Sequence, residues 1–162
     1  PPYLKLTGGR GESNGGSIFL EGSGSALHAT ACVFFDNHAV YGGSVRGYPG
    51  TSIRLYRSNV TNNTAENGGG GLYSNDGSLL VHHSLVARNT AGSRGGGIRQ
   101  YRGRLGIYRS RILENTQGPA DHAAWGGGGV SILDAAVVTV RCDRRVQDTR
   151  PASTKKRDAR CL

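Results

Sequence analysis

Long apolar runs, a helical hydrophobic period and metal-ligand spacings are all missing from this sequence. No apolar run reaches the length of a membrane-spanning helix, so no membrane span is expected, and the first residues show no signal peptide. Apolar residues do not recur at the i, i+3, i+4, i+7 spacing, so helices are not expected. The three cysteines (Cys32, Cys142 and Cys161) cannot all pair and lack a zinc-ligand spacing, so neither a metal nor a cofactor is expected.

Glycine, by contrast, is abundant and regularly placed. It supplies 27 of the 162 residues, without the three-residue period of collagen. Short glycine runs, each ending in one aliphatic residue, recur along the chain: Gly15–Ile18, Gly42–Val45, Gly69–Leu72, Gly95–Ile98 and Gly127–Val130. Four asparagines recur in step with these runs at intervals of 26 residues: Asn37, Asn63, Asn89 and Asn115. Such a fixed period is the signature of a repeat architecture, in which each unit buries its apolar face by stacking on the next.

Within each repeat the apolar residues have the spacing of β-strands. Pairs two residues apart precede each asparagine: Leu27 and Ala29, Ile53 and Leu55, Leu79 and Val81, Leu105 and Ile107. A single apolar residue stands three positions before it: Phe34, Val60, Val86 and Ile112. A spacing of two places side chains on one face of a strand, and the aliphatic residue after the glycines supplies a third strand. We therefore predict an all-β parallel β-helix of about four to five coils, with three strands in each 26-residue repeat.

The four asparagines are interpreted as a structural ladder. Stacked side-chain amides can hydrogen-bond along the axis of such a fold, as they do in cross-β structures. We expect the bend at each asparagine to need a left-handed or bridging backbone conformation, which Asn tolerates well. The glycines are expected at corners where a β-carbon does not fit.

The glycine runs and asparagines also resemble a known repeat. In the polymorphic outer-membrane proteins of chlamydiae, a Gly-Gly-Ala-Ile tetrapeptide is paired with Phe-x-x-Asn. Here Gly15-Gly16-Ser17-Ile18 is followed by Phe34-Phe35-Asp36-Asn37, and later repeats replace the phenylalanine with Val60, Val86 and Ile112. The resemblance covers roughly residues 15–133. It implies a right-handed, pectin-lyase-like β-helix at the cell surface or outside the cell, in an adhesive role.

Charge and composition divide the chain at about residue 140. Residues 141–162 hold eight Lys or Arg and three Asp, with almost no apolar residue after Val146. We predict β-helix repeats over 1–140 and a basic tail over 141–162 that is either disordered or a degenerate last coil. The segment Tyr3–Leu6 looks like the end of an earlier coil, so we expect a piece of a longer solenoid, with neighbouring coils as its partners.

A carbohydrate-active enzyme is the main alternative, because many pectin-lyase-like proteins are polysaccharide lyases or glycoside hydrolases. A hydrolase needs two carboxylates about 5–10 Å apart. The position before each asparagine instead reads Asp36, Asn62, Arg88 and Glu114, which places its two acids three coils apart. No acidic cluster suits a calcium-dependent lyase. We therefore name no catalytic residue, and the alternative is an enzyme fragment whose active site is absent or degenerate.

Tyrosine and arginine recur at positions expected to face outward. Tyr56 and Tyr108 flank His82 in one column, and the strand after the glycines carries further candidates: Arg46, Tyr48, Tyr73, Arg99 and Tyr101. Flat strips of Tyr and Arg suit glycans or a cell-surface protein, through stacking and charge-assisted hydrogen bonds. The competing interpretation is an ordinary soluble strand surface. Nucleic acid is not an expected partner, because the body of the chain is only mildly basic and shows no nucleic-acid motif.

One longer connection interrupts the period between Asn115 and the last glycine run. It contains the only tryptophan, Trp125, which we interpret either as a binding residue on an emerging loop or as a cap on the apolar end. Our sequence-based hypothesis is a non-catalytic repeat module of a surface or secreted protein, with a scaffold, adhesive or binding role. An ice-binding solenoid is a weaker alternative, because the threonine column forms a single file: Thr64, Thr90 and Thr116.

Overall fold

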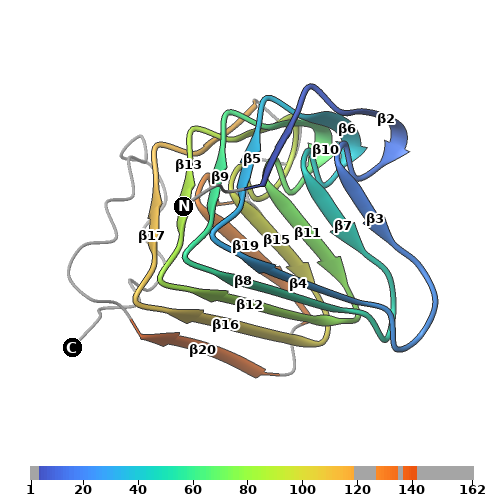
Figure 1. Ribbon diagram of the computed structural model, residues 1–162, viewed down its shortest axis with the longest axis vertical. Coiled ribbons are helices and arrows are strands. Elements are labelled where there is room, and N and C mark those ends of the chain that lie inside the picture. Colours follow the sequence, from blue (N-terminus) through green and yellow to red (C-terminus); the bar gives the residue numbers. More distant parts are fainter. Residues whose placement is uncertain (1–3, 119–126, 135–136, 142–162) are drawn as a thin grey trace.

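The computed structural model describes residues 4–118, 127–134 and 137–141, in which the chain winds as a parallel β-solenoid (Figure 1). Four sheets of five parallel strands run along it, and the chain visits them in the same order in every coil. Sheet A contains β1 (Lys5–Thr7), β5 (Val33–Phe35), β9 (Asn59–Thr61), β13 (Leu85–Ala87) and β17 (Arg111–Leu113). Sheet B contains β2 (Arg10–Asn14), β6 (His38–Tyr41), β10 (Thr64–Gly68), β14 (Thr90–Ala91) and β18 (Thr116–Gln117).

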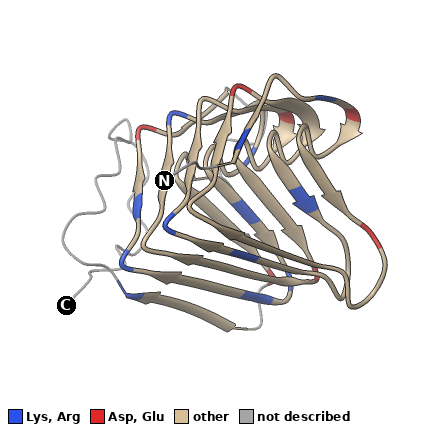
Figure 2. Ribbon diagram, in the orientation of Figure 1, with Lys and Arg blue, Asp and Glu red and all other residues tan. Residues whose placement is uncertain are grey.

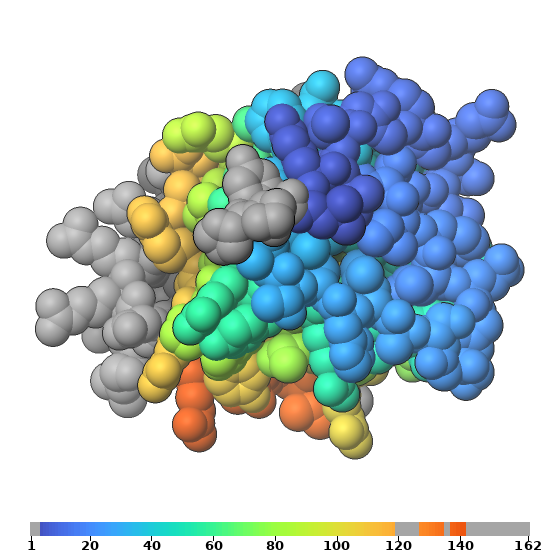
Figure 3. Space-filling model, viewed as in Figure 1, coloured from blue at the N-terminus to red at the C-terminus, as the bar shows by residue number. Residues whose placement is uncertain are grey.

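The other two sheets complete each coil. Sheet C contains β3 (Ile18–Leu20), β7 (Val45–Gly47), β11 (Leu72–Asn75), β15 (Ile98–Tyr101) and β19 (Val130–Leu133). Sheet D contains β4 (Ala26–Thr30), β8 (Ser52–Tyr56), β12 (Ser78–His82), β16 (Arg104–Tyr108) and β20 (Val137–Arg141). The coils follow one another as bands of colour from the blue N-terminal end to the orange end (Figure 3). The predicted parallel β-solenoid of about four to five coils is therefore confirmed.

The number of strands per coil differs from the prediction. We expected three, and the structure has four, because the residues after each asparagine form the strands of sheet B. In β6, β10 and β14 the inward residue is alanine, so no apolar alternation marks these strands. The inward alanines are nonetheless spaced by 26 residues: Ala39, Ala65 and Ala91.

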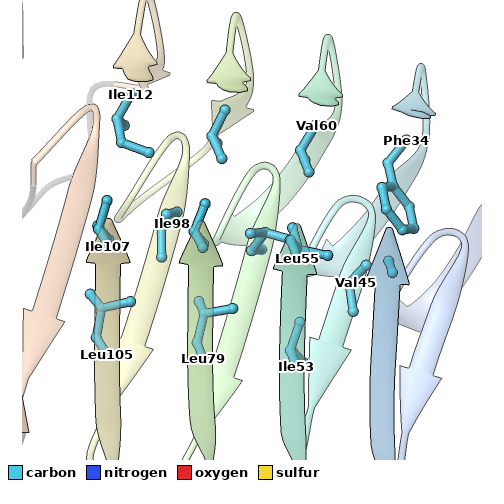
Figure 4. Packing of buried hydrophobic residues seen from close by; sticks show 14 of the residues in the cluster. Phe34, Val45, Ile53, Leu55, Val60, Leu79, Ile98, Leu105, Ile107 and Ile112 are labelled. Carbon is cyan, nitrogen blue, oxygen red and sulfur yellow. The ribbon is translucent and has the colours of Figure 1, made fainter. Parts of the chain in front are cut away.

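The strand register confirms the repeat period. Leu79 pairs with Ile53 on one side and Leu105 on the other, each 26 residues away. The same step relates Phe34, Val60, Val86 and Ile112 in sheet A, whose side chains are at most 4% exposed. These side chains stack as parallel columns inside the coils (Figure 4). Burying one such side chain contributes roughly 1.5–3 kcal/mol, so the columns supply the main stabilisation.

The four asparagines form the predicted ladder inside the solenoid. The Nδ2 atom of Asn63 donates to Oδ1 of Asn89 at 2.8 Å, and the Asn63 backbone N–H donates to the same oxygen at 3.0 Å. Asn89 donates in the same way to Asn115, and its Nδ2 also donates to the carbonyl of Val60. Asn89 is fully buried. Each amide therefore joins two coils and satisfies backbone groups at the corner between sheets A and B.

The left-handed backbone conformation lies one residue earlier than expected. The residues with positive φ at this corner are those before the asparagines, at 54–56°: Asp36, Asn62, Arg88 and Glu114. The asparagines do not have positive φ, so the left-handed alternative of the expected bend does not lie at the asparagines themselves. The ladder requires their side chains to point inward, and the residue before them makes the bend with its own side chain outside. Three of the four bend residues are Asp, Asn or Glu, and their polar side chains remain in solvent.

Glycine is required at the corner between sheets B and C, as predicted. A β-carbon on Gly43 would lie 2.1 Å from the carbonyl oxygen of Gly70, and one on Gly70 would lie 2.2 Å from that of Gly96. These contacts are with backbone atoms of the next coil, which cannot move aside separately. The adjacent Gly69 has a φ of 70°. The glycine runs therefore allow neighbouring coils to stack at this corner.

A second ladder crosses the corner between sheets D and A. The backbone N–H of Ser58 donates to Oγ of Ser84 at 3.0 Å, and Ser84 donates to Ser110 at 3.1 Å. Cys32 begins this column, since its N–H donates to Oγ of Ser58. Its thiol, which is free and buried, lies 3.3 Å from the Thr30 carbonyl. Cys32 therefore fills a small turn position, as its alignment with the serines predicted.

We expect Cys32→Ser to change the free energy of unfolding by no more than about 1 kcal/mol, which is small for a buried site. A serine hydroxyl can donate to Thr30 as Ser58 does to the carbonyl two residues before it. Thermal unfolding followed by circular dichroism measures this. Cys32→Leu is the contrasting variant, with an expected loss of about 1–3 kcal/mol from overpacking. A severe loss in Cys32→Ser would show that the column does not accept a hydroxyl there.

Several sequence-based expectations fall outside the described residues. They concern Trp125, Cys142, Cys161 and the basic tail from residue 142 onward. The last described strand, β20, pairs with β16 and continues the solenoid to Arg141. Its valines at 137, 138 and 140 are 40–50% exposed. The described residues contain no helix long and apolar enough to cross a membrane.

Candidate binding surfaces

An aromatic column runs across the outer face of sheet D. Tyr56, His82 and Tyr108 end three adjacent strands and are paired in register. The Tyr56 and His82 rings are stacked, with centroids 5.4 Å apart and planes 14° apart. The His82 and Tyr108 centroids lie 6.0 Å apart. The planes of His82 and Tyr108 are 52° apart, so the column is a row of neighbouring rings that are nearly parallel only between Tyr56 and His82.

A second column lies beside these rings at the next residue of the chain. Arg57, His83 and Arg109 have φ values of 46–49°, and all three are exposed. The guanidinium of Arg57 lies 5.1 Å above the Tyr56 ring, and the His83 ring makes an edge contact with His82 at 4.4 Å. We call the two columns together the sheet D strip. As expected from the sequence, His82 faces outward and His83 lies at the turn.

The sheet D strip offers stacking and positive charge together. Tyr56 is 36% exposed, so part of its side chain is accessible to a ligand beside its contacts with His82 and Arg57. No described strand of sheet C or sheet D carries an Asp or Glu, whereas both carry arginines (Figure 2). Arg54 and Arg104 on sheet D are exposed. The strip can therefore bind a flat apolar ring and hydrogen-bond to polar or anionic groups around it.

The predicted sheet C residues lie together, but they are less open than expected. Arg46, Tyr73 and Arg99 occupy one outward register column on β7, β11 and β15. We expected an exposed strip, yet Arg46 is only 9% exposed and Tyr73 only 5%. Tyr41, from the end of β6, covers them: its ring stacks on Tyr73 at 5.6 Å. The outer faces of sheets B and C therefore meet in a packed corner, which we call the B–C corner.

Arg46 lies between three tyrosine rings at this corner. Its guanidinium carbon is 4.5 Å from the Tyr41 centroid, 4.8 Å from that of Tyr48 and 5.2 Å from that of Tyr73. Arg46 also donates to Oδ1 of Asn14. Burial lowers the pKa of Arg46 from its ordinary value, because it removes water from the charged group. Burial likewise raises the pKa of Tyr73, so its hydroxyl stays protonated at neutral pH.

Arg99 reaches the same corner from two coils further on. Its guanidinium carbon lies 5.1 Å from the Tyr73 centroid. A β-carbon on Gly68 would lie 2.5 Å from Nη1 of Arg99, so the guanidinium rests on bare backbone at the end of β10. The Nε atoms of Arg46 and Arg99 are both buried without a hydrogen-bond partner. Among the described residues, neither arginine forms an ion pair.

The remaining predicted binding residues lie near the B–C corner. Tyr48 makes an edge contact with Phe19 at 4.9 Å and also contacts Arg46. Tyr101 lies under the guanidinium of Arg102 at 5.1 Å. The sequence analysis missed Tyr41, Asn14 and Gly68, which belong to the unpredicted strands of sheet B. A signal was present, since these three residues each precede a glycine run, but their types differ and no apolar pattern links them.

The carboxylates are dispersed around the solenoid. Asp36 and Glu114 lie at the same corner three coils apart. At the usual spacing of adjacent strands, this separates the two residues by roughly 14 Å. Glu114 pairs with Arg88 at 2.7 Å, and Glu66 lies 3.9 Å from His38. No group of three His, Cys, Asp or Glu side chains within the described ranges could hold a metal ion. These residues do not form a paired-carboxylate site.

A functional assignment for this chain depends on the arrangement of its side chains. No family model, curated protein or solved structure matches this chain. The two candidate surfaces differ in chemistry. In the sheet D strip Tyr56 is 36% exposed, whereas the B–C corner buries Tyr73 and Arg46, and its two arginines have no acidic partner among the described residues.

Proposed function

We propose that this chain is a non-catalytic β-solenoid module of a surface or secreted protein, and that it binds carbohydrate through the sheet D strip. The solenoid acts as the scaffold, holding identical positions of successive coils in line. The proposal includes a right-handed winding and kinship with the repeats of the chlamydial polymorphic outer-membrane proteins. The glycine and asparagine motifs support that kinship.

The open, stacked column of the sheet D strip carries the proposal. Tyr56 is 36% exposed and parallel to His82, with an arginine above its ring. Sugar rings present flat C–H faces that pack on aromatic side chains, and their hydroxyls accept hydrogen bonds from guanidinium groups. Because the rings repeat once per coil, a linear glycan lying along the solenoid can contact several of them.

The double variant Tyr56→Ala with Tyr108→Ala tests this function. We expect it to weaken binding about tenfold or more, since each lost aromatic contact removes roughly 0.5–1.5 kcal/mol beyond the buried area. A glycan array identifies the best-bound oligosaccharide, and titration calorimetry then measures its dissociation constant. Both tyrosines face outward, so thermal stability should change little.

Leu80→Ala is the matched control. Leu80 lies on the same sheet, between the two tyrosine-bearing strands, and faces outward two residues before His82. Its loss should leave the dissociation constant within about twofold, because it contributes no aromatic ring. Equal glycan affinity of the double tyrosine variant and the native chain would contradict the proposal.

A further inference from the structure

We propose that the B–C corner is a second binding site, which takes a linear polysaccharide bearing carboxylate or sulfate groups through Arg46 and Arg99. This site lies on a different sheet from the sheet D strip and recognises charge rather than ring faces. It therefore goes beyond the function proposed above. The observation behind it is a pair of guanidinium groups held in a packed corner without a carboxylate partner among the described residues.

Arg46 is a charged side chain that the corner almost fully buries. It is 9% exposed, and its Nε is buried without a hydrogen-bond partner. The titratable groups that act on it are three tyrosines and Arg99, and none of these described residues is a carboxylate. Buried arginines are ordinarily paired with an acid, because a charge removed from water needs a partner. An oxyanion bound at the outer edge of the guanidinium would supply a counter-charge without reaching the buried Nε.

The B–C corner also fixes the guanidinium of Arg46 in place. Three tyrosine rings pack around Arg46, and Asn14 accepts from its Nη1. Tyr41 is itself held, because Asn67 donates to its hydroxyl at 2.9 Å. The aromatic rings contact the faces of the guanidinium, so a ligand can bind only to the N–H groups along its edge. The geometry of this edge matches carboxylate and sulfate oxygens. Little side-chain entropy is left to lose on binding.

Arg99 has a similar environment. Its Nε is also buried without a hydrogen-bond partner among the described residues, and its guanidinium contacts Tyr73, the ring that Arg46 also contacts. Gly68 leaves the space that its guanidinium occupies. Arg46 and Arg99 are separated by one intervening strand, so the two charges lie roughly 10 Å apart along the solenoid. Two cationic points at a fixed interval suit a polymer with regularly spaced acidic groups.

These features favour an acidic polysaccharide over other polyanions. Nucleic-acid binding by single strands depends on bases that stack on open aromatic rings. Here Tyr73 is 5% exposed, so its ring is not open to a base. A flexible acidic peptide would lose more conformational entropy than a stiff sugar chain on aligning two charges with the arginines. The corner therefore fits a stiff chain whose acidic groups recur at a constant distance.

Chondroitin sulfate is the probe for the test, titrated into the native chain and its variants by calorimetry. We expect Arg46→Gln and Arg99→Gln each to weaken binding about tenfold or more, as for the loss of a charge-assisted hydrogen bond. Arg111→Gln makes the same change at an exposed site on sheet A and should stay within about twofold. Near-ultraviolet circular dichroism verifies folding. If Arg46→Gln does not fold, Arg99→Gln gives the result, because its side chain is less buried.

A spectroscopic readout separates binding from a structural role. The Nε–H resonances of Arg46 and Arg99 should shift on addition of chondroitin sulfate, and that of Arg111 on sheet A should not. Unchanged affinity in folded Arg46→Gln and Arg99→Gln variants would overturn the proposal. Equal binding of polyglutamate would indicate a peptide site, and equal binding of inorganic sulfate per charge would indicate an adventitious ion only; either result also overturns it.

The double tyrosine variant of the sheet D strip distinguishes this site from the first. It should bind chondroitin sulfate like the native chain, whatever its effect on the glycan identified by the array. If it abolished chondroitin sulfate binding while both arginine variants retained it, the polyanion would be bound by the sheet D strip and the B–C corner site would be wrong.

Discussion

Val86→Asp should abolish folding or lower the melting temperature by about 10 °C or more. Val86 is fully buried between Val60 and Ile112 in the sheet A column. A carboxylate placed there has no partner, so it must stay ionised at a cost of several kcal/mol or become protonated. The total stability of a domain is only about 5–15 kcal/mol. Thermal denaturation followed by circular dichroism measures the loss.

Arg88→Asp provides the comparison two residues away. The Arg88 side chain is 67% exposed and pairs with Glu114, and its φ of 55° is one that Asp tolerates. Loss of an exposed ion pair costs about 0–1 kcal/mol. The two variants have nearly the same composition and differ mainly in where the carboxylate lies. Equal melting temperatures would contradict the inward column on which the fold rests.

Asn89→Ala should have the second-largest effect, a loss of about 3 kcal/mol or more in the free energy of unfolding. The change removes the acceptor of the Asn63 backbone N–H and the donor to the Val60 carbonyl. Each buried polar group left without a partner costs about 1–3 kcal/mol. It also interrupts the amide ladder between the coils of Asn63 and Asn115. Urea denaturation measures the difference.

Asn59→Ala is the matched control for the ladder. Asn59 lies on β9, which is in the same sheet as Val86, and its side chain is exposed. The same chemical change there should cost within about 0.5 kcal/mol. If the two alanine variants unfold at the same urea concentration, the asparagine column contributes no more than an ordinary surface position.

The ladder also bears on the proposed binding surfaces. Outward positions on sheets C and D project from strands whose spacing is set inside the solenoid. The interval between Tyr56 and His82, and that between Arg46 and Arg99, follows from the same coil register. Substitutions on the outer face can therefore alter ligand contacts while the asparagines and aliphatic columns preserve the scaffold. This separation makes the binding variants interpretable.

The sequence alone determined the repeat and its register. The same residue types recur at the 26-residue period. Aligning the chain on its asparagines therefore identified the inward columns that the structure confirms, including Phe34 and Val86. Glycine and serine positions followed from the same alignment. These features depend on contacts between equivalent residues of successive coils, and such contacts require like side chains at a constant spacing.

Only the tertiary structure decided how the coils bend and what the bends bring together. The fourth strand of each coil was not predicted because its inward residues in the middle coils are alanines. The residue before each ladder asparagine takes the left-handed conformation because the asparagine side chain must point inward. Alternation along β7 places Arg46 outside sheet C, yet it is buried because the corner turns Tyr41 of sheet B over it. An extra residue in β10, as compared with β6, leaves Gly68 where Arg99 can pack. Contacts between different sheets depend on the angles at which the chain turns from one sheet to the next. The spacing of residues along a strand gives no information about these angles.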